Sequence, residues 1–241
     1  HLSIRRQRQM CIRDRIRAGK SQLSKGGVVF WFDTIDSTLL TLAKPIFDRY
    51  NIPATVSFKQ NSLGLTGKMT KENLTTLQDG GWDIVSYPYT STSMTTLTTV
   101  GVDTQLQKPH QWLVDNGFRG NKILAFSQTA HNALVDSIAE KYYNYARGLS
   151  IFGGYLGHKT YYAPIPAFDA KYCINQFTYY TSPLDSMKGM VDSVETGRNA
   201  AVFLFHGCNV SPASTVIDTG RLDSLLSYLS LIHISEPTRP Y

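Results

Sequence analysis

The chain has 241 residues, of which 42% are hydrophobic and 17% are charged, as expected for one globular domain with a sizeable core. No apolar run approaches the ~18 residues that a membrane-spanning helix requires, so the sequence predicts no such span. The formal net charge of +6 is concentrated at the two ends, and the remainder shows no footprint for nucleic acid or a membrane surface.

Both ends of the chain, residues 1–15 and 229–241, resemble translated sequencing adapters; the alternative is a basic N-terminal arm and a short C-terminal tail. These ends carry six arginines against one aspartate and one glutamate, so the net charge falls from +6 to +2 without them. We therefore predict one domain over residues 16–228, and we expect the natural N-terminus, with any secretion signal, to lie upstream.

The first predicted strand, residues 28–32, is an unbroken run of Val, Phe and Trp. Such a run is typical of a strand that is covered on both faces, as in a parallel sheet or barrel. Asp33 follows at the carboxyl end of this strand, where α/β barrels keep their chemistry; the alternative is that it caps the next helix. That helix is expected over residues 39–47, although Pro45 argues against one unbroken helix.

Strand and helix patterns alternate along the rest of the chain. Strands are expected at residues 54–59, 82–87, 122–125, 143–147, 174–179 and 200–205, and helices at 70–79, 106–116, 132–142, from 182 onward, and at 218–228. This alternation implies parallel βα units with right-handed crossovers. The sequence therefore predicts an α/β fold, a distorted or incomplete (β/α)7 barrel.

Two segments between these elements read as loops. Residues 91–99 are rich in Ser and Thr, and residues 150–170 are rich in Gly and Tyr, which makes the second segment a candidate binding loop. Cys173 is expected at the start of one strand and Cys208 just past the end of the next. Because that separation exceeds the reach of a disulfide, we predict two free, partly buried thiols.

Three of these segments carry a resemblance to a known family: residues 28–37, the Tyr-Asn-Ile-Pro-Ala turn at 50–54, and the Gly-Gly-Trp-Asp-Ile-Val-Ser-Tyr run at 80–87. Their order and spacing resemble the polysaccharide deacetylase (NodB-homology) family of carbohydrate esterases, over roughly residues 26–228. The resemblance implies a distorted barrel, hydrolysis of the acetamide groups of N-acetylglucosamine-containing polymers, and a location outside the cell or at the cell envelope.

The resemblance also implies a catalytic site. The family uses a divalent metal, commonly zinc, that acidifies a water and polarises the carbonyl, together with an Asp base and a His acid. Asp33 matches the base, and His206 matches the acid. The three metal-ligand positions are Thr34, Tyr87 and Ser91, whose neutral oxygens are poor zinc ligands. We therefore expect no metal cofactor here.

Two further histidine interpretations stay open. Asp33, Asp36 and His206, with His131 from the loop at 126–132, could bind a metal in a shifted place, although that arrangement needs supporting contacts that sequence does not show. The alternative for His206 is a satisfied interior histidine. His110, like His158, is expected at the surface.

Aromatic side chains near the predicted strand ends suggest contact with sugars. Most aromatics pack in the core, but Trp31, Tyr87 and Tyr89 are candidates for stacking on sugar rings. Two hypotheses follow. One is a deacetylase-like hydrolase with altered chemistry that uses Asp33 and His206; the other is a non-catalytic glycan-binding or structural module of a cell-envelope or phage-associated protein. Both predict a glycan partner and no nucleic acid.

Overall fold

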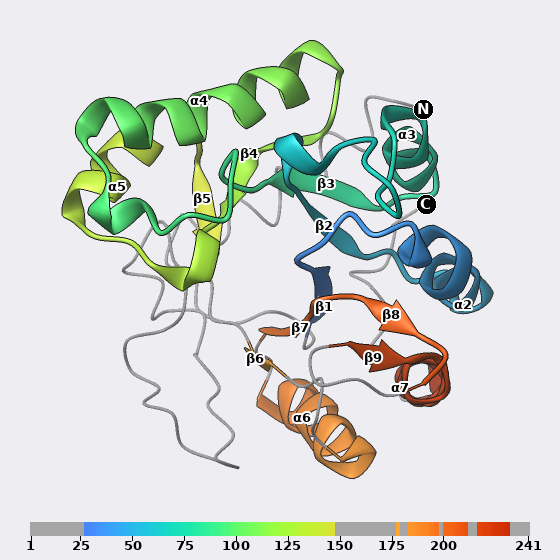
Figure 1. Ribbon diagram of the computed structural model, residues 1–241. Helices are drawn as coiled ribbons and strands as arrows, with labels where there is room; N and C mark the ends of the chain where they lie inside the picture. The colour runs from blue at the N-terminus through green and yellow to red at the C-terminus, as the bar shows by residue number, and fades with distance from the viewer. Residues whose placement is uncertain (1–26, 148–176, 179–182, 198–199, 212–215, 232–241) are drawn as a thin grey trace, which may run out of the picture.

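The computed structural model describes residues 27–147, 177–178, 183–197, 200–211 and 216–231 (Figure 1). Its centre is one parallel sheet with the strand order β5-β4-β3-β2-β1-β7-β6. The strands are β1 (Gly27–Phe32), β2 (Thr55–Phe58), β3 (Asp83–Ser86), β4 (Gly120–Ala125), β5 (Tyr145–Arg147), β6 (Phe177–Thr178) and β7 (Ala200–Phe205). The sheet curls, and its two edge strands β5 and β6 do not pair in the described part of the chain, so the predicted incomplete barrel is confirmed.

Helices are arranged around the outside of the strands (Figure 1). They are α2 (Lys44–Tyr50), α3 (Lys71–Asp79), α4 (Thr99–Asp115), α5 (Ala133–Ala139), α6 (Leu184–Gly197) and α7 (Thr219–Leu231). Shorter pieces are the π-helix η1 (Leu39–Ala43), the 3-10 turns η2 (Gln60–Ser62), η3 (Met94–Thr96) and η4 (Ser127–Thr129), and the small pair β8 (Cys208–Asn209) and β9 (Ile217–Asp218). The last helix continues past residue 228, and Leu229 is buried.

The alternation of side chains along β1 explains how one strand serves two cores. Phe30 and Phe32 face the helices, where their rings contact Phe47. Trp31 points the opposite way, into the barrel interior, where it joins Val85 and small or aliphatic residues of β4 and β7. A strand that is buried on both faces reads as a continuous apolar run, and residues 30–32 are buried in this way, whereas Val29 is exposed.

Local sequence signals set most helix boundaries. Thr70 caps α3 by accepting from the Asn73 backbone, while the Asn73 side chain accepts from the Thr70 backbone. Pro45 lies in the first turn of α2, and the π-helix η1 runs directly into that helix, so residues 39–47 are helical throughout, with an irregular turn before Pro45 rather than a break. The helix predicted from residue 106 instead begins at Thr99.

The early start of α4 has a clear cause. Thr98 caps it by accepting from the Gly101 backbone, and the helix then runs through Pro109. Ser- and Thr-rich sequence therefore supplied a cap rather than only a loop. His110 on the same helix is 8% exposed and its Nδ1 lies 2.9 Å from the Asn121 carbonyl, so the expectation of a surface histidine was wrong.

Gly120 permits the close approach of β4 to β3. A Cβ built there would lie 2.2 Å from the Ile84 carbonyl oxygen, and the register shifts at this point between Val85 and Ser86. Only glycine fits such a gap. Cys208 is buried and free, whereas Cys173 and most of the predicted strand at 174–179 lie outside the described residues. Among the helices described, none is both long and apolar enough to span a bilayer.

Candidate functional site

A pocket of about 80 Å³ lies where β1, β2 and β3 end. Side chains from the segments that follow these strands line it, among them Asp33, Thr34, Lys59, Lys68, Tyr87 and Ser91. Carboxyl ends of parallel strands converge at one edge of a sheet, which is where barrel folds place their binding groups. The predicted base position and all three metal-ligand positions of the resembled family therefore line the same pocket.

Asp33 is held by an ion pair in the barrel interior. Its Oδ2 accepts from Arg147, whose side chain is fully buried, and its Oδ1 accepts from Ser57 Oγ at 2.6 Å. The Asp33 side chain itself is 12% exposed. Because its two oxygens each accept a hydrogen bond, the carboxylate is fixed in orientation at the floor of the pocket.

Trp31 supports this ion pair. Its Nε1 donates to Ser57 Oγ at 2.7 Å, and the Arg147 guanidinium lies 4.8 Å from its ring centroid. The indole is 3% exposed, which leaves no face for a sugar. Trp31 was a candidate for stacking on substrate; in the structure it positions the groups around Asp33 instead.

Arg147 is the site residue that sequence reasoning missed. The sequence predicts a strand that ends at this residue, and a charged side chain at the carboxyl end of a strand was the available signal. Nothing local connects it with Asp33, however, because β5 is an edge strand and lies far from β1 in the sheet order. Only the curl of the sheet brings the two side chains together across the interior.

Neutral hydroxyl groups also line the pocket. Tyr87 donates through its hydroxyl to Ser127 Oγ at 3.3 Å. Burial, reinforced by the negative charge of Asp33, raises the pKa of the Tyr87 phenol above its ordinary value, so this group is protonated at neutral pH. Thr34 Oγ1 accepts from the Asp36 backbone at 3.2 Å.

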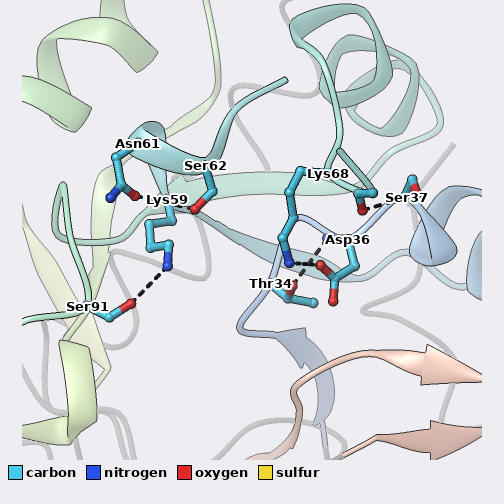
Figure 2. A network of polar contacts seen from close by, with 9 residues as sticks. Thr34, Asp36, Ser37, Lys59, Asn61, Ser62, Lys68 and Ser91 are labelled. Carbon is cyan, nitrogen blue, oxygen red and sulfur yellow. Dashed lines mark hydrogen bonds and ion pairs between the residues drawn. The ribbon is translucent and has the colours of Figure 1, made fainter. Parts of the chain in front are cut away.

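Lys59 brings a positive charge to the same place. Its Nζ donates to Ser91 Oγ at 3.0 Å, as Figure 2 shows. The Ser91 carbonyl accepts from Ser127 Oγ at 2.9 Å and from Gln128 Nε2 at 3.1 Å, which fixes the loop that carries Ser91. Ser91, one of the positions that the resembled family uses for a metal ligand, thus has a hydroxyl that accepts a hydrogen bond from the Lys59 ammonium.

These residues do not fit a divalent metal. Zinc sites in proteins use imidazole, thiolate or carboxylate donors, whereas Thr34, Tyr87 and Ser91 offer neutral oxygens, and Lys59 would repel a cation beside Ser91. Within the described ranges, no three His, Cys, Asp or Glu side chains come together as a metal site requires.

The alternative shifted metal site finds no support among the described contacts. Asp36 pairs with Lys68 (Figure 2), and Asp33 pairs with Arg147. His131 places Nδ1 3.0 Å from Asp136 Oδ1, and its ring stacks on Phe126 with centroids 4.7 Å apart. The groups proposed for that site are engaged with different partners.

His206 leaves the sheet beside Asp33. The strands β1 and β7 pair in register with Phe32 opposite Phe205, and the Asp33 amide donates to the Phe205 carbonyl at 2.9 Å. His206 is exposed and does not line the pocket that contains Asp33. The role of these two residues as an acid/base pair stays a prediction.

The remaining aromatic candidates differ in position. Tyr87 lines the pocket, whereas Tyr89 is half-buried outside the lining, with the Lys108 ammonium 4.8 Å from its ring centroid. The candidate binding loop at 150–170 lies outside the described residues.

Comparison with solved structures shows what this fold is. A family 4 carbohydrate esterase from Streptomyces lividans in complex with acetate superposes with a TM-score of 0.57 at 16% identity, covering 86% of this chain and 89% of that one. A family 4 carbohydrate esterase pseudoenzyme from Bacillus anthracis gives 0.54 at 16% identity, covering 87% and 62%. The esterase domain of a xylanase from the hindgut metagenome of Trinervitermes trinervoides gives 0.54 at 11%, covering 87% and 82%.

The chain therefore has the fold of the family 4 carbohydrate esterases, the polysaccharide deacetylase fold that the sequence predicted. No protein-family model and no curated protein sequence matches it.

Proposed function

We propose that this chain is a polysaccharide deacetylase-like domain that binds acetylated, N-acetylglucosamine-type glycans without the metal-dependent hydrolysis of the enzymes that share its fold. We place it outside the cell or at the cell envelope, where such glycans occur. The observation that carries the proposal is the chemistry of the pocket: hydroxyls at positions 34, 87 and 91, and an ammonium from Lys59 on one of them.

Amide hydrolysis needs an activated water, stabilisation of the oxyanion and a proton for the leaving amine. The pocket retains a carboxylate, Asp33, but its oxygens already accept from Arg147 and Ser57. The described residues that line the pocket offer no donor set for a metal, so none of them holds an ion that would acidify a water bound next to Asp33. The scaffold and a partly open polar pocket remain, and these support a binding function.

Solved relatives of this fold include both outcomes. One is a deacetylase whose structure includes substrate, which aligns with a TM-score of 0.54 at 14% identity, and another is the Bacillus anthracis pseudoenzyme. A mutant of that pseudoenzyme has restored enzymatic activity. Loss of activity on this scaffold therefore has a precedent, which supports the absence of hydrolysis in our proposal.

The test combines metal content, turnover and binding on the full chain. We expect no stoichiometric zinc after dialysis against zinc salt, no acetate release from chitin tetrasaccharide, and binding of that oligosaccharide that a chelator does not change. Stoichiometric zinc together with acetate release would overturn the proposal.

A metal-independent hydrolase is the second candidate. It is favoured because Asp33 and His206 directly follow the paired strands β1 and β7. It predicts acetate release that persists with chelator and is lost in His206→Gln.

A further inference from the structure

The charges that line the pocket do not balance. Asp33 pairs with Arg147, and Lys68 pairs with Asp36. Lys59 also lines the pocket, but in the part of the chain that the structure describes it contacts no carboxylate; its one recorded partner is the Ser91 hydroxyl. Among the described residues, one positive charge is therefore left over in this partly open polar pocket.

Hydrogen-bond donors are also in excess there. An ammonium has three N–H donors and no acceptor, and Lys59 directs one of them at Ser91 Oγ. The Ser91 hydroxyl accepts that bond and keeps its own O–H, and the Thr34 hydroxyl accepts from the Asp36 backbone and keeps its O–H. The carboxylate of Asp33, the strongest acceptor in the lining, is already engaged by Arg147 and Ser57.

We propose that this pocket is an anion site, in which Lys59, with the hydroxyls of Ser91 and Thr34, binds the carboxylate of an acidic sugar in the recognised glycan. A carboxylate accepts hydrogen bonds and donates none, so it matches a lining with surplus donors and one uncompensated positive charge. This inference rests on the proposed function, and it deepens it by naming the charge of the ligand.

The size of the pocket agrees with such a group. A cavity needs roughly 10–15 Å³ of the same kind of volume to hold one water, so about 80 Å³ accommodates a carboxylate with a few waters. The negative charge of Asp33 does not repel the anion strongly, because the ion pair with the fully buried Arg147 neutralises that charge. Lys59 thus places a positive charge beside Ser91, one of the positions that the resemblance assigns to a metal ligand, and this charge favours an anion.

The test compares two tetrasaccharides by calorimetry on the full chain. One alternates N-acetylglucosamine with glucuronate, and the other is neutral chitin tetrasaccharide. We expect the acidic glycan to bind about tenfold more tightly, the size of one charge-assisted contact in a partly exposed site. Lys59→Met should remove that difference and Lys59→Arg should keep it. Lys141→Met, which removes an exposed lysine paired with Asp103 outside the pocket, should also keep it.

Equal affinities for the two glycans, unchanged by Lys59→Met, would overturn the anion site while leaving the glycan-binding function in place. If neither glycan binds, the proposed function fails, and free glucuronate then decides the inference. Shifts of the Lys59 and Ser91 amide resonances with glucuronate but not glucose, lost in Lys59→Met, would support the anion site. No shift with glucuronate would overturn it.

Discussion

The buried ion pair between Arg147 and Asp33 offers the sharpest test of the structure. Arg147→Met keeps most of the side-chain volume but leaves Asp33 without its counter-charge. Removing one partner of a buried pair costs about 3–5 kcal/mol, because the other charge stays desolvated and uncompensated. Asp33 keeps the hydrogen bond from Ser57 and is 12% exposed, which favours the lower end of that range.

The reverse substitution should cost more. Asp33→Asn leaves the guanidinium of Arg147, which is fully buried and which cannot shed its proton. The double variant removes both charges, so we expect its loss of stability to be smaller than the sum of the two single losses. A negative interaction energy of this kind marks a direct contact.

The assay is urea unfolding followed by tryptophan fluorescence, with thermal unfolding as a second measurement. For a domain of this size, about 3–5 kcal/mol corresponds to a decrease in Tm of about 6–20 °C. Arg49→Met is the matched control: its pair with Asp223 has side chains that are 59% and 38% exposed. Exposed pairs contribute below about 1 kcal/mol. If Arg147→Met were no more destabilising than Arg49→Met, or if the double variant were simply additive, the buried pair would be refuted.

Three further outcomes are expected. The first concerns a variant that restores the family's ligands and removes the ammonium, through the substitutions Thr34→Asp, Tyr87→His, Ser91→His and Lys59→Met. This variant should bind zinc stoichiometrically, as metal analysis would show. The same variant with Lys59 retained should bind zinc more weakly. Gly120→Ala should lower the free energy of unfolding by about 3 kcal/mol, since its Cβ would collide with the Ile84 carbonyl. Gly189→Ala has open space around its Cβ and should raise the free energy of unfolding by about 0.5–1 kcal/mol. Equal effects of the two substitutions in urea unfolding would contradict the β3–β4 contact. Burial raises the pKa of the Cys208 thiol to about 12, so the thiolate forms only in strong alkali. In a variant without the other two cysteines, reaction of Cys208 with a thiol reagent at pH 8 should require unfolding. Fast reaction of the folded chain would refute the burial of this thiol.

The sequence by itself determined the local structure and the identity of the groups at the site. The apolar run before Asp33 predicted β1, the cap at Thr70 predicted the start of α3, and the resemblance pointed to positions 34, 87 and 91, which line one pocket. These features were predictable because strand and helix periods, caps and motif order depend on residues that are close together in the chain.

The tertiary structure alone decided how those groups are charged and supported. Arg147 reaches Asp33 because the sheet curls, and Lys59 reaches Ser91 because the two residues follow the neighbouring, paired strands β2 and β3. Trp31 is of a residue type that can stack on sugars, but its ring is buried in the barrel interior, where it contacts the Arg147 guanidinium. Each of these contacts joins residues distant in sequence, and the strand pairing and curvature that create them are properties of the whole sheet, which no local pattern encodes.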